Sequence, residues 1–211
     1  MKEEVLKQLN WRYATKTFNP NKKLTQEEIN YLLNAIQLSP SSSGLQAWKC
    51  VVITDPETRK QLREVSFNQP QVTDSSCLFV FCSQQEVSED YIDDYIELVA
   101  TTREMELSKL DALKQSIKGS VSKMTSENME IWLAKQVYIP LGILLTTCAI
   151  NGFDACPMEG FQKEKYDQIL NLDHHGLKSQ VLCSVGYRDE NDWLSKLKKV
   201  RFSQDDLFIK I

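Results

Sequence analysis

A chain of 211 residues is long enough to form one domain around a continuous hydrophobic core. Its content of 42% hydrophobic and 26% charged residues is ordinary for a globular protein and excludes a fibrous or disordered chain. The formal net charge of −4 gives no general reason to expect nucleic acid as a partner.

The first half of the chain alternates helices and strands. Thr25 and Glu28 have the spacing of a capping box, and the apolar residues after them recur at intervals of three and four. Pro56 is typical of the first turn of a helix, and the continuous apolar run over 76–83 is typical of a strand buried on both faces. The predicted elements are, in order, a helix over 3–12, a helix opened by Thr25, a strand over 48–55, a helix over 56–66 and a strand over 76–83.

The second half begins with a charged helical region. Residues 91–117 carry only a sparse apolar stripe (Met105, Leu110 and Leu113), and Gly119 with the following SVSKMTSEN (120–128) is expected to break this helical region. The elements expected after it are a long helix over 128–150 that ends at Asn151-Gly152, a strand over 153–160 that ends in a turn, a helix over 162–170, a strand over 179–187 and a tail over 201–211 with alternating apolar residues. We find no repeat and no change of composition that marks a second domain. Residues 1–211 are therefore expected to form one domain with a three-layer α+β or α/β arrangement.

The sequence gives no sign of secretion or of a membrane span. The amino terminus is charged from its second residue and lacks an apolar core followed by a cleavage site. The most apolar segment, 138–153, is too short to cross a bilayer and is expected to be a buried core helix. We expect a cytoplasmic protein with no membrane partner.

The cysteines and histidines do not have metal-ligand spacing. The six cysteines form no C-x-x-C pair, and most lie among apolar residues, so we expect reduced core thiols. His174 and His175 are adjacent without a third ligand nearby, which favours a polar loop pair over a metal site. These cysteines are Cys50, Cys77, Cys82, Cys148, Cys156 and Cys183.

Four polar stretches are candidates for a binding site. The chain has no nucleophile elbow, no P-loop, no zinc-protease motif and no G-x-G-x-x-G, so a dinucleotide turn of the usual kind is absent. Each polar stretch alone is typical of an ordinary solvated segment. Together they offer cations, hydroxyls and amides, the groups that bind phosphate. The stretches are WRYATKTF (11–18), SPSSSGLQ (39–46), CPMEG (156–160) and LKKVRF (197–202).

With FNQPQVTDSS (67–76), WLAKQVYIPLGILL (132–145) and GFDACPMEGF (152–161), these stretches resemble the FMN-dependent nitroreductases nearly end to end. The resemblance is nearest to the oxygen-insensitive NAD(P)H nitroreductase and dihydropteridine reductase group. It implies an α+β fold with three α/β/α layers and a central, mostly antiparallel sheet flanked by helices. It also implies a helical lid inserted at about residues 91–125 and an extended carboxy-terminal tail.

The resemblance assigns the cofactor phosphate to three cations from distant segments. Arg12, Lys199 and Arg201 match the residues that bind the FMN phosphate, whose charge explains why several cations would converge. Lys16 matches a lysine beside the flavin pyrimidine edge, where its charge would favour the anionic reduced ring.

The remaining site residues come from three loops. The serine loop (residues 40–44) matches a loop that contacts the flavin of the neighbouring subunit, which would explain why the preceding helix ends in hydroxyls. Asn68 and Gln71 match positions at the pyrimidine and ribityl side. The loop at 157–160 matches one whose backbone N–H faces flavin N5. The residues so assigned are Pro40, Ser41, Ser42, Ser43, Gly44, Asn68, Gln71, Pro157, Met158, Glu159 and Gly160.

The chain departs from the family pattern at several of these positions. Tyr13 and Ala14 stand where many relatives have His and Ser, so one hydroxyl contact on the phosphate side is lost. Gly44 replaces a common Asn, Gln71 a common Lys, and Ala47 a common Pro. FMN binding remains the expectation, whereas the potential and the substrate preference stay open.

The function implied is a homodimeric flavoenzyme with FMN at the subunit interface and a ping-pong cycle. NAD(P)H would pass hydride to flavin N5, and a nitroaromatic, quinone or pterin-like acceptor would then take it. No side chain is assigned as a catalytic residue, because the flavin carries the chemistry. The alternatives are a related flavin reductase or dehalogenase-like enzyme, a protein that stores or senses FMN without turnover, and a helical domain with no cofactor.

Overall fold

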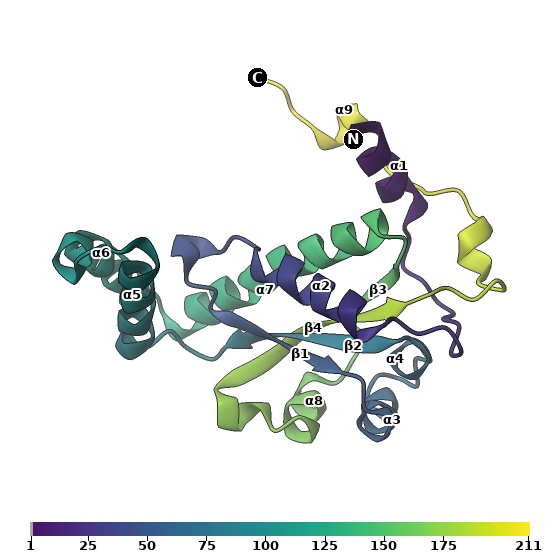
Figure 1. Cartoon of the computed structure of the whole chain (residues 1–211), viewed down its shortest axis with the longest axis horizontal. Helices are drawn as coiled ribbons and strands as arrows, with labels where there is room; N and C mark the ends of the chain where they lie inside the picture. Colours follow the sequence, from purple (N-terminus) through teal and green to yellow (C-terminus); the bar gives the residue numbers. More distant parts are fainter. Residues whose placement is uncertain (1) are drawn as a thin grey trace.

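A four-stranded sheet forms the centre of the protein in the computed structural model, which describes residues 2–211 (Figure 1). Its strands are β1 (Trp48–Ile53), β2 (Cys77–Gln84), β3 (Asp154–Met158) and β4 (Leu177–Gly186). They lie in the order β1-β2-β4-β3, and every neighbouring pair is antiparallel. The sheet is thus fully antiparallel, which agrees with the mostly antiparallel sheet that the resemblance implies.

Strand β2 is buried on both faces, as its apolar run predicts. Successive side chains of a strand point to opposite faces, so one set of β2 residues enters each half of the core. Phe79 and Phe81 belong to the cluster on one face, and Leu78 and Val80 to the cluster on the other. All four side chains are fully buried.

Helices cover both faces of the sheet and complete three layers (Figure 1). On one face lie α2 (Gln26–Gln37) and α7 (Ser126–Ile150). On the other lie α3 (Pro56–Glu64), α4 (Gln71–Asp74) and α8 (Lys163–Ile169). The three-layer α+β fold predicted from the sequence is confirmed.

The expected capping box opens α2. The Glu28 backbone N–H donates to Thr25 Oγ1 at 3.2 Å, and the Thr25 N–H donates to Glu28 Oε2 at 2.7 Å. Ile29, Leu32 and Ile36 then place their side chains in the core. The capping box and the 3.6-residue spacing of the apolar residues therefore both predict this helix.

Helix α7 is the long core helix that the sequence predicts. It begins at Ser126 behind the N-cap Thr125, two residues before the predicted start, and continues through Pro140. Among the described residues it is the one helix long and apolar enough to cross a membrane. Its residues Val137, Leu144 and Cys148, however, pack into the same core cluster as strand β2, as those of a core helix do.

The helical excursion differs in detail from the prediction. Helix α5 (Glu89–Arg103) ends at Glu104, whose φ of 52° lies in the left-handed region. After a 3₁₀ turn at Leu107–Leu110, α6 (Asp111–Val121) runs straight through Gly119. The break expected over Gly119 and residues 120–128 lies between α6 and α7, after Val121 and not at Gly119 itself, because glycine lowers helix stability without stopping an otherwise supported helix.

The excursion has an apolar cluster of its own. The expected stripe is only partly right, since Leu110 is buried whereas Met105 and Leu113 are each 37% exposed. Lys114 and Lys118 of α6 both pair with Asp93 of α5, at 3.0 and 2.9 Å. The buried members contributed by the excursion are Ile92, Ile96, Val99, Ala100, Leu110 and Ile117.

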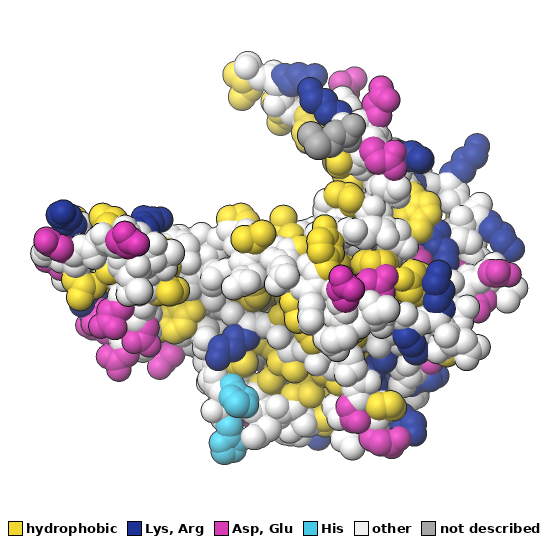
Figure 2. Space-filling view, in the orientation of Figure 1, with side chains coloured by type: hydrophobic (Ala, Val, Ile, Leu, Met, Phe, Trp, Pro, Cys, Tyr) yellow, Lys and Arg dark blue, Asp and Glu magenta, His cyan; other side chains and the backbone are white. Residues whose placement is uncertain are grey.

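The two ends of the chain project together from the body as an arm (Figures 1 and 2). Helix α1 (Lys2–Trp11) lies where a helix is predicted, but none of its residues is buried, and Leu6 is 63% exposed. The tail forms a single turn, α9 (Gln204–Leu207), and exposes Phe208 and Ile209. The apolar face of α1 is therefore not covered within one chain.

All six cysteines are free thiols, and only Cys50 is half-buried. Burial raises the pKa of both Cys77 and Cys82 to about 12. The expectation of reduced core thiols agrees with this placement.

Candidate functional site

Residues 12–18 lie along the β3 edge of the sheet. Ala14 forms a parallel bridge with Ala155 of β3, and Phe18 forms an antiparallel bridge with Arg188. The WRYATKTF segment is thus fixed beside the strand that leads into the 157–160 loop.

An acid inside β3 anchors the start of this segment. Asp154 is buried, accepts a hydrogen bond from Thr15 Oγ1 at 3.2 Å, and pairs with Arg188 Nη2 at 2.6 Å. The Arg188 guanidinium lies over the rings of Trp11 and Tyr13, at 4.0 and 4.5 Å from their centroids. Burial raises the pKa of Tyr13 to about 12, so its hydroxyl stays protonated at neutral pH.

Arg12, Lys199 and Arg201 converge from the two ends of the chain, and we call them the cationic cluster. The Lys199 ammonium donates to the backbone oxygens of Leu9, at 2.5 Å, and Arg12. Burial, and then the charge of Arg201, lowers the pKa of Arg12. Burial, and then the charges of Arg12 and Arg201, lowers the pKa of Lys199. The three cations therefore repel one another.

The cationic cluster has the composition of an anion site. Within residues 2–211, none of its members has an ion pair with an acid. Arg12 Nε is buried and has no hydrogen-bond partner in this range. A bound phosphate would offset the repulsion and accept a charge-assisted bond from this nitrogen. The convergence that the sequence resemblance implies is present in the fold.

Lys16 and Gln71 both influence Cys156, which lies in the middle of β3. Burial raises the pKa of the Cys156 thiol, while the Lys16 charge and a hydrogen bond from the Gln71 side chain lower it. Gln71 is 5% exposed, and its Oε1 has no hydrogen-bond partner within the described chain. The amide oxygen is thus a buried acceptor to which the described chain supplies no donor.

The resemblance assigns residues 157–160 to a loop, but Pro157 and Met158 are the last residues of β3, and only Glu159 and Gly160 follow the strand, against the loop that precedes α4. Gln69 Nε2 donates to the Gly160 backbone oxygen at 2.7 Å, and the neighbouring Asn68 has a φ of 57°. Tyr138 Oη of α7 donates to Glu159 Oε1 at 2.7 Å. Met158 is buried at the end of β3. The structure brings these predicted residues to the same edge as Lys16 and the cationic cluster.

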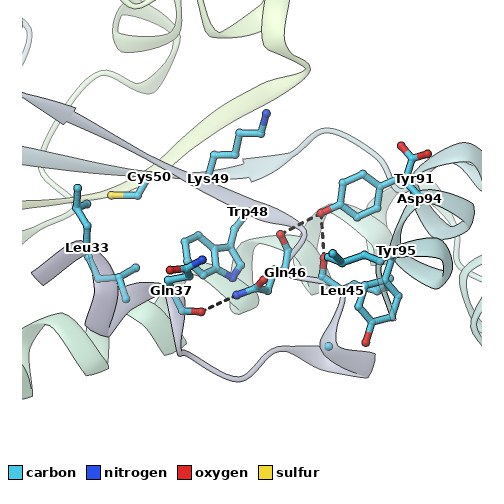
Figure 3. A pocket seen from close by; sticks show the side chains of 13 residues that line it. Leu33, Gln37, Leu45, Gln46, Trp48, Lys49, Cys50, Tyr91, Asp94 and Tyr95 are labelled. Carbon is cyan, nitrogen blue, oxygen red and sulfur yellow. Dashed lines mark hydrogen bonds between the residues drawn. The ribbon is translucent and has the colours of Figure 1, made fainter. Parts of the chain in front are cut away.

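The serine loop lies elsewhere, between α2 and β1 and against α5 (Figure 3). Ser42 to Gly44 form a 3₁₀ turn, and the Ser42 N–H donates to Gln136 Oε1 of α7 at 2.9 Å. Tyr91 Oη of α5 donates to the backbone oxygens of Leu45 and Gln46, at 2.9 and 3.0 Å. Both α7 and α5 therefore hold this loop in place.

Gly44 is required by its surroundings. Its φ is 74°, and a Cβ there would stand 2.3 Å from the Tyr95 hydroxyl oxygen. Tyr95 thus fills the space where a side chain of residue 44 would project. This accounts for glycine at a position where the resemblance leads one to expect asparagine.

A cavity of about 510 Å³ extends from the serine loop between α2, β1 and α5 (Figure 3). Leu33, Trp48 and Leu98 give it apolar walls, and Trp48 Nε1 is buried without a partner in the described residues. Within one chain, this end of the molecule is opposite the end that carries the arm and the cationic cluster (Figure 1). The structure does not bring the serine loop to the other predicted site residues.

Comparison with known proteins identifies the family. The model described as "Nitroreductase family" matches residues 9–187 of the chain. This chain belongs to the nitroreductase family. The family consists of oxidoreductases, and the chain is an enzyme of that class.

Relatives of this nitroreductase match over most of their length. The protein named as NAD(P)H nitroreductase YfkO of Bacillus subtilis is 33% identical over 199 residues, which cover 89% of this chain and 90% of that protein. A second relative, named as NAD(P)H nitroreductase SERP2086 of Staphylococcus epidermidis, is 31% identical, and the match covers 98% of this chain and 96% of that protein.

Solved structures share the nitroreductase fold. The nitroreductase ydfN of Bacillus subtilis superposes with a TM-score of 0.90 at 18% identity, over the whole of both chains. A nitroreductase of Exiguobacterium sibiricum in complex with FMN superposes with a TM-score of 0.83 at 20% identity, over 99% of this chain and 96% of that one.

Several residues that contact the predicted site residues escaped the sequence prediction. Asp154 and Asp192 accept hydrogen bonds from residues 15–17, Arg188 pairs with Asp154, and Tyr138 and Tyr95 contact the predicted loops. Asp154 carried a usable signal, since an acid among apolar strand residues requires a partner. The others lie in turns or on helices where their residue types are ordinary.

Proposed function

We propose that this nitroreductase binds FMN and transfers hydride from NAD(P)H to small oxidised acceptors, such as a nitroaromatic, a quinone or a pterin-like compound. The observation that carries the proposal is the cationic cluster, in which mutually repelling cations from both chain ends surround the buried, unpartnered Arg12 Nε. The chemistry of that donor set fits the phosphate of FMN.

The residues beside the cluster fit the rest of the cofactor. Gln71 offers its buried amide oxygen to an N–H group of the flavin ring. Asn68 and the backbone of residues 157–160 lie on the same side of the site as Gln71. The Lys16 ammonium would stabilise negative charge on the ring. Bound FMN would supply the hydride-transfer chemistry, while the protein binds it, orients it and leaves one face open to two successive substrates.

We further propose that the working unit is a homodimer, with the serine loop of one chain completing the flavin site of the other. Support comes from the placement of the serine loop, between α2 and β1, at the end of the chain opposite the arm (Figure 1). It also comes from the uncovered arm, where Leu6, Phe208 and Ile209 expose apolar surface (Figure 2). The proposed partners are a second copy of the chain and small molecules, with no nucleic acid and no membrane. The proposed location is the cytoplasm.

Anaerobic spectroscopy tests this function. The purified protein, loaded with FMN and desalted, is expected to keep a yellow flavin spectrum that NADH or NADPH bleaches without air. Addition of a nitroaromatic or quinone is expected to restore the yellow colour. A protein that stays colourless after incubation with FMN contradicts the proposal.

The same experiment separates the alternatives. A storage or sensing protein would hold yellow FMN that neither NADH nor NADPH bleaches. A flavin reductase or a dehalogenase-like enzyme would be bleached, but reoxidised by free flavin or a halogenated compound rather than by nitroaromatics and quinones.

A further inference from the structure

Asp192 is a fully buried carboxylate whose side-chain hydrogen bonds are all with the backbone. Its Oδ2 accepts from the N–H groups of Lys16 and Thr17, at 2.7 and 2.9 Å. Its Oδ1 accepts from the Leu194 N–H at 3.0 Å, at the start of the 3₁₀ turn Trp193–Lys196. Burying a carboxylate without a cationic partner costs free energy that these N–H groups must offset.

This carboxylate joins the two segments that carry the predicted cofactor cations. The contact with Lys16 spans 176 positions in the sequence. The segment that contains Asp192 continues to Lys199 and Arg201. The segment that Asp192 contacts carries Arg12 and, four residues later, Lys16. The Asp189 N–H also donates to the Thr17 oxygen at 2.9 Å, so the two segments run together around this point.

We propose that Asp192 is a positioning residue of the flavin site, which fixes the main chain at Lys16 and thereby sets where the Lys16 ammonium stands beside β3. The role rests on the proposed function, because its purpose is to place a cation against the flavin ring. Both charges act on the Cys156 thiol of β3: the Lys16 charge lowers its pKa, and the Asp192 charge raises it.

The midpoint potential of the bound flavin distinguishes positioning from a direct effect of the Asp192 charge. A nearby cation stabilises the more negative, reduced ring and raises the potential, whereas a nearby anion lowers it. Removing an anion that acts directly would therefore raise the potential. Removing an anion that holds Lys16 in place is expected to lower it.

The test compares Asp192→Asn with Asp189→Asn in the FMN-loaded protein. Asp189 belongs to the same turn and its carboxylate accepts from Asn191, so its substitution removes the same charge without releasing Lys16. Asp192→Asn is expected to lower the midpoint potential and to weaken FMN binding by about tenfold, the size of one charged hydrogen bond. Asp189→Asn is expected to change neither quantity.

A second background shows whether the effect passes through Lys16. In a Lys16→Met protein, Asp192→Asn is expected to lower the potential no further. Asp192→Glu keeps the charge but shifts the carboxylate by one methylene, so it is expected to lower the potential in the same direction, and it serves if Asp192→Asn does not fold. Hydrogen exchange in the flavin-free protein is expected to be faster at the Lys16 and Thr17 amides in Asp192→Asn only.

The outcomes separate this role from the proposed function. A potential that rises or stays unchanged in Asp192→Asn, or unaltered exchange at the two amides, overturns the role while FMN binding by the unsubstituted protein stands. An unsubstituted protein that binds no FMN overturns the proposed function, and the positioning role with it.

Discussion

At the scale of single residues, the cationic cluster is the feature that is electrostatically unfavourable when no anion is bound. Burial and mutual repulsion lower the pKa of Arg12 and of Lys199, so the fold disfavours the charged forms that both groups keep at neutral pH. A bound anion would reverse this balance, because each cation then gains a partner. Ligand binding to the folded state alone would also stabilise the protein, by about 2.7 kcal/mol at a hundredfold excess over Kd.

Arg201→Ala tests the role of the cluster. We expect FMN binding to weaken by about 1.5–3 kcal/mol, the contribution of a hydrogen bond to a charged group. The thermal stability of the flavin-free protein is expected to hold or rise slightly, because Arg12 and Lys199 lose a repelling neighbour. Fluorescence titration with FMN and thermal unfolding measure the two quantities.

The matched control is Lys198→Ala, which removes an exposed cation next to the cluster. It is expected to leave FMN affinity unchanged. Equal affinity of the Arg201→Ala and unsubstituted proteins would remove the phosphate role from Arg201.

At the scale of elements, helix α5 determines the shape of the serine loop. Tyr91 and Tyr95 are four residues apart and therefore lie on one face of α5. Tyr91 holds the carbonyls after the loop, and Tyr95 occupies the space above Gly44. The lid helix and the serine loop thus form one unit, with Ser43 and Gly44 both at positive φ.

Gly44→Ala tests this unit. An alanine at a φ of 74°, with its Cβ 2.3 Å from the Tyr95 oxygen, is expected to cost about 1–3 kcal/mol of stability and to lower the flavin content. Adding Tyr95→Phe is expected to recover part of the loss, because the clashing hydroxyl goes while the backbone strain remains. Thermal unfolding of the single and double variants measures this.

Gly119→Ala is the matched control, because a Cβ there meets nothing within 4 Å. Gly119 lies inside α6, so alanine is expected to stabilise the protein by about 1 kcal/mol. The proposed packing is wrong if Gly44→Ala is as stable as the unsubstituted protein.

The elements show what the sequence could predict and what it could not. Capped or strongly periodic segments such as α2 and β2 were predictable, because local signals and core packing agree there. The end of α5 was not, since a left-handed Glu104 has no sequence signature. Family resemblance assigned Lys16, but Asp154 and Asp192, which hold the segment that carries it, depend on contacts between distant parts of the chain.

At the scale of the whole molecule, the arm and the serine loop lie at opposite ends of the chain, and we propose that these ends carry the two halves of a shared site (Figure 1). The cationic cluster and the loops around β3 form one half, and the serine loop with α5 forms the other. The exposed apolar arm lies at the first end (Figure 2). A symmetric dimer would bring unlike halves together twice, so each flavin site would need both chains.

Subunit complementation tests this central claim most directly. An Arg12→Ala/Arg201→Ala chain lacks the cationic half, and a Gly44→Val chain lacks the serine-loop half. Each variant alone is expected to hold little FMN. The two chains carry different affinity tags, are expressed together, and yield a mixed dimer that is purified through both tags.

The mixed dimer contains one site built from two intact halves and one built from two altered halves. It is therefore expected to hold about one FMN per dimer. NAD(P)H is expected to reduce this bound flavin. Flavin content no higher than that of the parent variants, or failure to recover any doubly tagged dimer, would contradict a site shared between chains.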